Sequence, residues 1–256
     1  MTERHQDSAI PGLMADKPAE PSSDQPRSTG QRRPPQLMVF DVNETLSDRS
    51  GMAEHFADVG APPALARTWF ASLLRDGFAL TVGGANPEFA DLAATSLAAM
   101  LTAEHVADVD SAVDRVMRAF TSLPVHPDVV DGIRHLAALG IRLVTLSNGS
   151  TTVAEGLFER SGITGHFERL LSVHDAPAWK PAQAAYQYAL NVCDADGDDT
   201  VLVAVHPWDI HGARQAGLRT AYINRGGATY PTYFDRADVE VTSLVELAAH
   251  FDDANR

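Results

Sequence analysis

VFDVNETLSD, residues 39–48, places a single acid, Asp41, directly after a short apolar run. That run, LMVF at residues 37–40, is continuous and bounded by polar residues, which is typical of a short buried strand. An asparagine, Asn43, stands two residues after the acid. The stretch therefore predicts a buried strand that carries one carboxylate at its end, with an amide nearby in place of a second acid.

The pattern on either side of this strand predicts the class of fold. Residues 52–122 carry apolar side chains at three- and four-residue spacing, as helices do, whereas helical patterns alternate with short apolar runs from residue 123 onward. Such alternation favours an α/β fold with a doubly wound parallel sheet and helices on both faces. We expect an α/β core domain at residues 36–51 and 123–256, with residues 52–122 inserted as a helical cap above the carboxyl ends of the strands.

Composition excludes several classes of partner. The formal net charge is −14, which argues against binding to nucleic acid or to an anionic membrane. No apolar run reaches the roughly 18 residues that would span a bilayer. The single cysteine, Cys193, excludes an internal disulfide and fits a reducing cytoplasm, so we expect a cytoplasmic protein. Residues 1–35 are rich in Pro, Ser, Asp, Gln and Arg, which predicts a disordered tail.

Polar residues follow four of the predicted elements at the edge where open α/β sheets bind ligands. They are Asp41, Ser147 with Asn148, Lys180, and the segment from His206 to Asp209. Any one of them alone would commonly be a helix cap or a turn residue. All four together predict a functional site.

Lys180 has separate support from composition. The sequence contains only two lysines, Lys17 and Lys180, and every other basic residue after residue 36 apart from histidine is an arginine. A lysine is a compact point charge without the planar fork of arginine. A position that keeps lysine in such a chain indicates a need for that compact charge.

The motifs FDVNETL, LVTLSNGS, WKPAQAAY and VHPWDIHGARQAG, in this order and spacing, resemble those of the haloacid dehalogenase (HAD) superfamily. They are most similar to the type II (S)-2-haloacid dehalogenases, and the resemblance covers residues 37–250. It implies a hydrolase that cleaves the carbon–halogen bond of a small 2-haloacid through an aspartyl ester, without a cofactor. Type II relatives are often dimers, so the resemblance leaves a homodimer open.

The resemblance also implies catalytic roles for five residues. Asp41 would be the nucleophile, and Lys180 would keep it ionised. Thr45 and Ser147 would hold the nucleophile or the substrate by hydrogen bonds. Asp209 matches the acid of the fourth motif and is the nearest candidate for the base that activates water; the alternative is an ion pair with Lys180 that transfers no proton.

Substrate-binding residues are implied in the same way. Asn148 would support the substrate carboxylate, and Tyr186 matches a tyrosine of the dehalogenase site. The remaining candidates are Asn43, Trp69, Phe70 and His206. Trp69 and Phe70 would line an apolar pocket under the cap, although aromatic residues at helical spacing more often belong to a core.

Asn43 bears on the choice of reaction. Phosphatases of the superfamily carry an aspartate at this place, which protonates the leaving alkoxide. An amide cannot do so, whereas a halide leaves as a stable anion and needs no proton. The alternatives left open are a Mg²⁺-dependent phosphatase, with Asp41, the Asn43 carbonyl and Asp209 around the ion, and a catalytically silent HAD-fold binding protein.

Three positions depart from the dehalogenase pattern. The family has an arginine directly after the cap tryptophan to help bind halide, where this chain has Phe70, and Arg75 is a weak substitute. The family also has a serine and an asparagine ahead of the fourth-motif acid, where this chain has Ala204 and His206. His206 could donate a hydrogen bond or act as a base near neutral pH.

Overall fold

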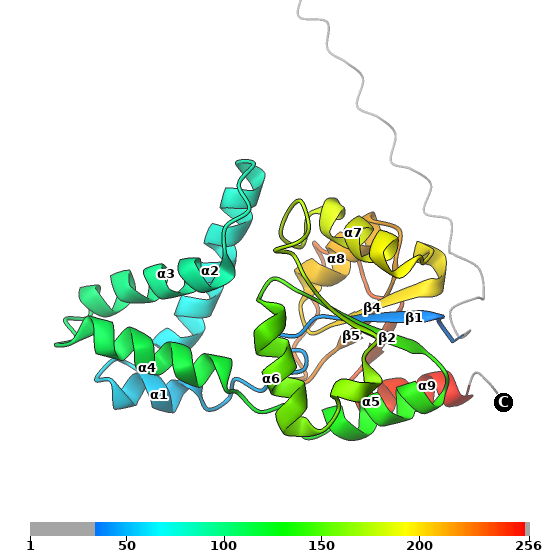
Figure 1. Cartoon of the computed structure of the whole chain (residues 1–256), viewed down its shortest axis with the longest axis horizontal. Coiled ribbons are helices and arrows are strands. Elements are labelled where there is room, and N and C mark those ends of the chain that lie inside the picture. The colour runs from blue at the N-terminus through cyan, green and yellow to red at the C-terminus, as the bar shows by residue number, and fades with distance from the viewer. Residues whose placement is uncertain (1–33, 254–256) are drawn as a thin grey trace, which may run out of the picture. The chain divides into compact units, whose positions relative to one another are not determined.

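The computed structural model describes residues 34–253. Residues 1–33 of the predicted tail therefore lie outside the described residues. The described part of the chain contains one parallel sheet of six strands in the order β3-β2-β1-β4-β5-β6 (Figure 1). The strands are β1 (Leu37–Phe40), β2 (Arg142–Ser147), β3 (Arg169–Ser172), β4 (Thr200–Ala204), β5 (Arg219–Ile223) and β6 (Val239–Val241). The predicted α/β class and the predicted strand at residues 37–40 are confirmed.

Helices cover both faces of the sheet, so the central strands β1 and β4 are buried on both sides. Met38 and Phe40 pack with apolar residues of α5, α6 and α9, whereas Leu37 and Val39 pack with those of α7 and α8. Figure 1 shows α7 and α8 on one side of the sheet and α5 and α9 on the other. These helices are α5 (Val129–Ala138), α6 (Thr151–Ser161), α7 (Gln183–Cys193), α8 (Pro207–Gln215) and α9 (Leu244–Asp253).

Four helices stand between β1 and α5 along the chain, and we call them the helical insertion. They are α1 (Met52–Asp58), α2 (Leu65–Val82), α3 (Phe89–Ala103) and α4 (Val109–Thr121). Their shared core is aromatic: the rings of Trp69 and Phe120 meet edge to face at 5.5 Å, and Phe89 stacks on Phe120 at 6.1 Å. The helices agree with the expected cap, and its exact bounds at residues 52 and 122 stay a prediction.

Trp179, in the loop before α7, contacts the helical insertion. Its ring stacks on Phe89 at 5.6 Å, and its indole N–H donates to the carbonyl of Pro87 at 2.9 Å. A Cβ on Gly77 of α2 would lie 2.2 Å from the same ring, so only glycine allows this close approach. The residue before Lys180 is therefore fixed against the insertion.

The two segments that connect the insertion to the rest of the fold run antiparallel, side by side. Ser47 and Val125 form a bridge, Asp48 N donates to Pro124 O at 2.8 Å, and His126 N donates to Leu46 O at 3.0 Å. The insertion is thus joined to the α/β core through one short two-stranded ribbon.

The structure differs from the sequence pattern at two elements. The apolar run TVLVAVHPWD ends as a strand at Ala204, because Pro207 begins α8, where proline is favoured in the first helical turn. The three-residue strand β6 was not predicted, since so short a stretch carries no clear period. In the described residues, no helix is both long enough and apolar enough to cross a membrane.

Candidate active site

Asp41 lies directly after β1, at the carboxyl edge of the sheet, and is 3% exposed. Its Oδ2 accepts a hydrogen bond of 2.6 Å from the hydroxyl of Thr45, and its Oδ1 accepts one of 2.9 Å from Nζ of Lys180. The Thr45 hydroxyl in turn accepts from the amide of Val205 at 3.1 Å. Two donors therefore fix the direction of the carboxylate.

Lys180 is completely buried and lies between two carboxylates. Its Nζ donates to Asp41 at 2.9 Å and to Asp209 at 2.6 Å. Asn148, after β2, fixes the lysine main chain: its amide donates to the Lys180 carbonyl at 3.2 Å, and its carbonyl accepts from the Lys180 amide at 3.0 Å. Segments that follow four different strands, β1 to β4, thus meet at Lys180.

Asp209, in the first turn of α8, has donors on both carboxylate oxygens. Lys180 donates to Oδ2, and the hydroxyl of Tyr186 donates to Oδ1 at 2.6 Å. Asp209 and Tyr186 are both 0% exposed. The structure therefore places Tyr186 against Asp209 and shields it from solvent, and its predicted contact with substrate stays a prediction.

Asp41, Lys180, Asp209 and Tyr186 form what we call the buried network, and burial acts on the pKa of Lys180, of Asp209 and of Tyr186. Burial would lower the pKa of the Lys180 ammonium, but the charges of Asp209 and Asp41 outweigh it and raise that pKa above its usual value. Burial raises the pKa of Asp209 despite the attraction of Lys180. Burial and the charge of Asp209 also raise the pKa of Tyr186 well above 10, so its hydroxyl keeps the proton that it donates.

His206, between β4 and α8, lies on the other side of Asp41. Its Nε2 is 3.1 Å from the carbonyl oxygen of Asn43 and 3.6 Å from Oδ2 of Asp41. Its ring stacks on Trp208, with centroids 4.9 Å apart. The structure thus brings the predicted His206 next to the predicted nucleophile.

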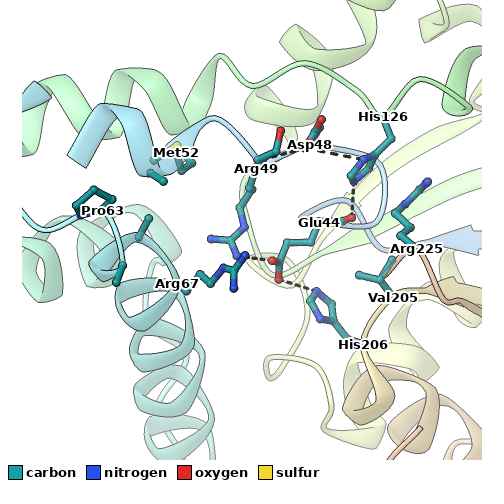
Figure 2. A pocket seen from close by; sticks show the side chains of 14 residues that line it. Glu44, Asp48, Arg49, Met52, Pro63, Arg67, His126, Val205, His206 and Arg225 are labelled. Carbon is teal, nitrogen blue, oxygen red and sulfur yellow. Dashed lines mark hydrogen bonds and ion pairs between the residues drawn. The ribbon is translucent and has the colours of Figure 1, made fainter. Parts of the chain in front are cut away.

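A cavity of about 590 Å³ opens beside His206, and we call it the large cavity. Figure 2 shows the Glu44 side chain between those of Arg49 and His206 at this cavity. Glu44 Oε1 makes a short ion pair with Nη2 of Arg49, and Oε2 lies 3.6 Å from Nε2 of His206. The Arg49 guanidinium also lies 3.9 Å over the ring of Phe70.

A second, smaller cavity of about 60 Å³ is lined by Val42 and Asn43 of the loop after β1 and shares no lining residue with the large cavity. Asn43, Ser147 and Asn148 line its polar side, and Phe89, Met117 and Phe120 of the insertion are among its apolar walls. The hydroxyl oxygen of Ser147 accepts from the amide of Gly149 at 2.9 Å. We call this the small cavity.

Trp69 and Phe70 line neither of these cavities. Trp69 is 0% exposed, and its indole donates to the carbonyl of Ala93 at 3.0 Å inside the insertion. Phe70 is 2% exposed and packs against Phe120 and Arg49. Both residues belong to the core of the insertion, which is the more common place for aromatic residues at helical spacing.

The sequence interpretation missed Glu44 and Arg49. Glu44 has a φ of 65°, in the left-handed region that β-carbon sterics disfavour for residues other than glycine. Arg49 places a guanidinium on the ring at position 70, whereas the sequence analysis considered only Arg75 on α2. Arg75 is instead paired with its exposed neighbour Asp76 at 2.8 Å.

Comparisons with known proteins bear on this arrangement. A model of the haloacid dehalogenase-like hydrolases matches residues 35–217 of the chain. (S)-2-haloacid dehalogenase 4A of Burkholderia cepacia is 28% identical over 211 residues, which is 82% of this chain and 91% of that protein. An (S)-2-haloacid dehalogenase of Pseudomonas sp. strain YL is 31% identical over 63% of this chain and 70% of its own length.

Solved structures agree with these relatives. The crystal structure of a dehalogenase with an intermediate complex superposes with a TM-score of 0.79 at 28% identity, covering 84% of this chain and 96% of that one. The L-2-haloacid dehalogenase RSc1362 superposes with a TM-score of 0.80 at 24% identity, covering 86% of this chain and 99% of that one, and so shares the fold.

Proposed function

The chain belongs to the haloacid dehalogenase-like hydrolases, and from this premise we propose that it hydrolyses the carbon–halogen bond of small 2-haloacids through an ester on Asp41. One observation carries the proposal. The carboxylate of Asp41 lies between the ammonium of Lys180 and the hydroxyl of Thr45, with no acid at position 43 to serve a leaving group that needs a proton.

In the first step, a carboxylate oxygen of Asp41 attacks the α-carbon of the substrate, and the halide leaves with the bonding electron pair. The nucleophile attacks as a carboxylate, and the raised pKa of Lys180 keeps a positive charge beside it at neutral pH. The hydrogen bonds from Lys180 and Thr45 also fix the direction of the carboxylate, which reduces the entropy lost in reaching the transition state.

The small cavity suits the substrate itself. The hydroxyl oxygen of Ser147 already accepts a hydrogen bond from Gly149, which leaves its proton for the substrate carboxylate. We assign Asn148 a supporting part, since its amide group orients the main chain of Lys180. The apolar wall formed by Phe89, Met117 and Phe120 would exclude water from the carbon under attack.

The residues do not fit a magnesium-dependent phosphatase well. A cation held by Asp41 and Asp209 would need the position that the Lys180 ammonium takes between them. The third predicted ligand, the Asn43 carbonyl, faces Nε2 of His206 at 3.1 Å. We therefore derive no step through a metal ion.

The direct test is halide release from (S)-2-chloropropionate, measured with and without EDTA. We expect release in both conditions, and we expect Asp41→Asn to lower the rate on the order of 10⁴-fold or more because the nucleophile is lost. A single turnover in heavy-oxygen water should place the label in the Asp41 side chain.

An aryl phosphate serves as the control substrate. Phosphate release that EDTA abolishes would support the phosphatase alternative. Silence on both substrates, together with a rise in melting temperature on adding 2-haloacids, would support a binding protein. Full activity of the Asp41→Asn variant would exclude the covalent route.

A further inference from the structure

Hydrolysis of an Asp41 ester needs a base that can reach water, and Asp209 does not meet that need in this structure. Both of its oxygens already accept hydrogen bonds of 2.6 Å, from Lys180 and from Tyr186, and the residue is 0% exposed. A general base must lie within hydrogen-bond reach of the water that it activates. The base is therefore expected on the side of Asp41 where His206 and the large cavity lie.

Glu44 is the carboxylate on that side. It lines the large cavity, and its side chain is 31% exposed, so water reaches it. Its left-handed backbone is held from both directions: the Glu44 amide donates to the hydroxyl of Ser47 at 3.2 Å, and the Glu44 carbonyl accepts from Nε2 of His126 at 2.9 Å. Uncommon backbone conformations of this kind concentrate at functional sites.

The Glu44 carboxylate and the nucleophile both lie next to His206. Nε2 of His206 lies 3.6 Å from Oε2 of Glu44 and 3.6 Å from Oδ2 of Asp41 (Figure 2). The same nitrogen faces the Asn43 carbonyl at 3.1 Å, which accepts only, so Nε2 carries a proton in this arrangement. His206 thus acts as a donor that positions its neighbours, and Glu44 is the group that can accept a proton.

We propose that Glu44 is the general base, and His206 a positioning residue, for hydrolysis of the Asp41 ester, an inference that rests on the proposed function. Oδ2 of Asp41 faces His206, and Oδ1 faces Lys180, so we assign the ester bond to Oδ2. The ammonium of Lys180 then lies where the oxyanion forms on Oδ1.

The step balances with water as the only added reactant. Glu44 takes one proton from water while the water oxygen attacks Cγ of Asp41, and the carbonyl electrons move to Oδ1. When the carbonyl re-forms, the bond between Cγ and Oδ2 breaks. Oδ2 leaves in the 2-hydroxy acid and receives the proton that Glu44 took, and the new Asp41 carboxylic acid loses its remaining proton to solvent.

Arg49 balances the negative charge of Glu44 at the large cavity. Its guanidinium pairs with Glu44 and lies over the ring of Phe70, and its Nε is buried without a hydrogen-bond partner. The ion pair places a positive charge beside the Glu44 carboxylate. It also fixes the carboxylate from the side opposite to His206.

The variant Glu44→Gln separates the two half-reactions. We expect it to release about one equivalent of halide at close to the normal rate, and then to turn over at least about 100-fold more slowly because the base is lost. Intact-mass measurement should show the protein carrying the acyl group. Glu44→Asp, which keeps the carboxylate but shortens it, should lose the ester faster than Glu44→Gln.

Asp48→Asn is the matched control. Asp48 is another carboxylate of the large cavity, and its Oδ1 accepts a hydrogen bond of 2.8 Å from the amide of Ser50. Its variant should turn over within about twofold of the normal rate and accumulate no ester.

Three outcomes would overturn the inference while leaving the proposed function intact. They are full turnover by Glu44→Gln, loss of the first equivalent of halide in that variant, and accumulation of ester in Asp209→Asn but not in Glu44→Gln. If the normal protein releases no halide from any 2-haloacid, the proposed function itself fails, and that result is distinct from the other three.

Discussion

The charged groups on the two sides of Asp41 differ in their exposure to solvent. On one side, Lys180, Asp209 and Tyr186 are all 0% exposed and every charged oxygen of Asp209 has a donor. On the other side, Glu44 and His206 border the large cavity, and their side chains are 31% and 12% exposed. Lys180, Asp209 and Tyr186 are thus shielded from solvent, whereas Glu44 and His206 are in contact with it.

This difference separates the two halves of the proposed reaction. Forming the ester needs an ionised carboxylate in a fixed direction, and a buried, fully bonded network provides that. Cleaving the ester needs a group that gives and takes protons, and only the cavity side offers one in contact with water. Variants on the two sides should therefore fail at different steps.

The largest effect on stability is expected from Lys180→Met. Removing one partner of a buried ion pair typically costs about 3–5 kcal/mol, and here it would leave Asp41 and Asp209 buried together without the ammonium. Burial and the charge of Asp41 raise the pKa of Asp209, and the variant would lose the opposing attraction of Lys180. The variant should therefore regain stability as the pH is lowered from neutral, because Asp209 then binds a proton more tightly in the folded state than in the unfolded state.

Urea unfolding at several pH values measures this change, and halide release from the same variant should lose its first equivalent. A variant that is as stable as the normal protein, or that forms the ester at the normal rate, would contradict the proposed difference between the two sides of Asp41.

A smaller effect is expected from Tyr186→Phe, which keeps the ring but removes the donor to Oδ1 of Asp209. A buried acceptor left without a partner costs about 1–3 kcal/mol in the free energy of unfolding. Tyr188→Phe on the same helix is the control, because Tyr188 is only half-buried, and it should change stability by no more than about 0.5 kcal/mol. Thermal unfolding of the two variants side by side makes the measurement.

The smallest effect on stability is expected from Glu44→Gly. Glycine relieves the left-handed strain of about 1–2 kcal/mol, but it loses more chain entropy on folding and the ion pair with Arg49. The free energy of unfolding should therefore change by about 1 kcal/mol or less, while ester hydrolysis falls as it does in Glu44→Gln.

Asp194→Gly is the matched control for that change. Asp194 is exposed at the end of α7 with a φ of 49°, so it shares the backbone conformation but not the site. Chemical denaturation and halide release, measured on both variants, should show similar stabilities and a loss of turnover at position 44 alone.

The sequence predicted the buried network better than the cavity side. The class of fold, the strand before Asp41 and the meeting of Asp41, Lys180 and Asp209 follow from motif order and from a parallel sheet that gathers its strand ends at one edge. The lone lysine after residue 36 indicated the same position. These features depend on local pattern and topology, which a sequence carries directly.

The cavity side depends on information that the sequence carries only weakly. The contact of Arg49 with Phe70 joins a connecting segment to α2, and no periodicity links those positions. Glu44 gave one signal, a glutamate within the loop of the first motif, but its positive φ appears only in the structure. Trp69 and Phe70 carried a helical spacing that fits both a core and a pocket, and packing in three dimensions placed them in the core.

The ribbon formed by Ser47 and Val125 has a mechanical consequence. Because both crossings of the chain are hydrogen-bonded to each other, neither can slide along the other without breaking these bonds. His126 belongs to one crossing and donates to the carbonyl of Glu44, just before the other. The ribbon that attaches the helical insertion therefore also anchors the backbone that carries the Glu44 carboxylate.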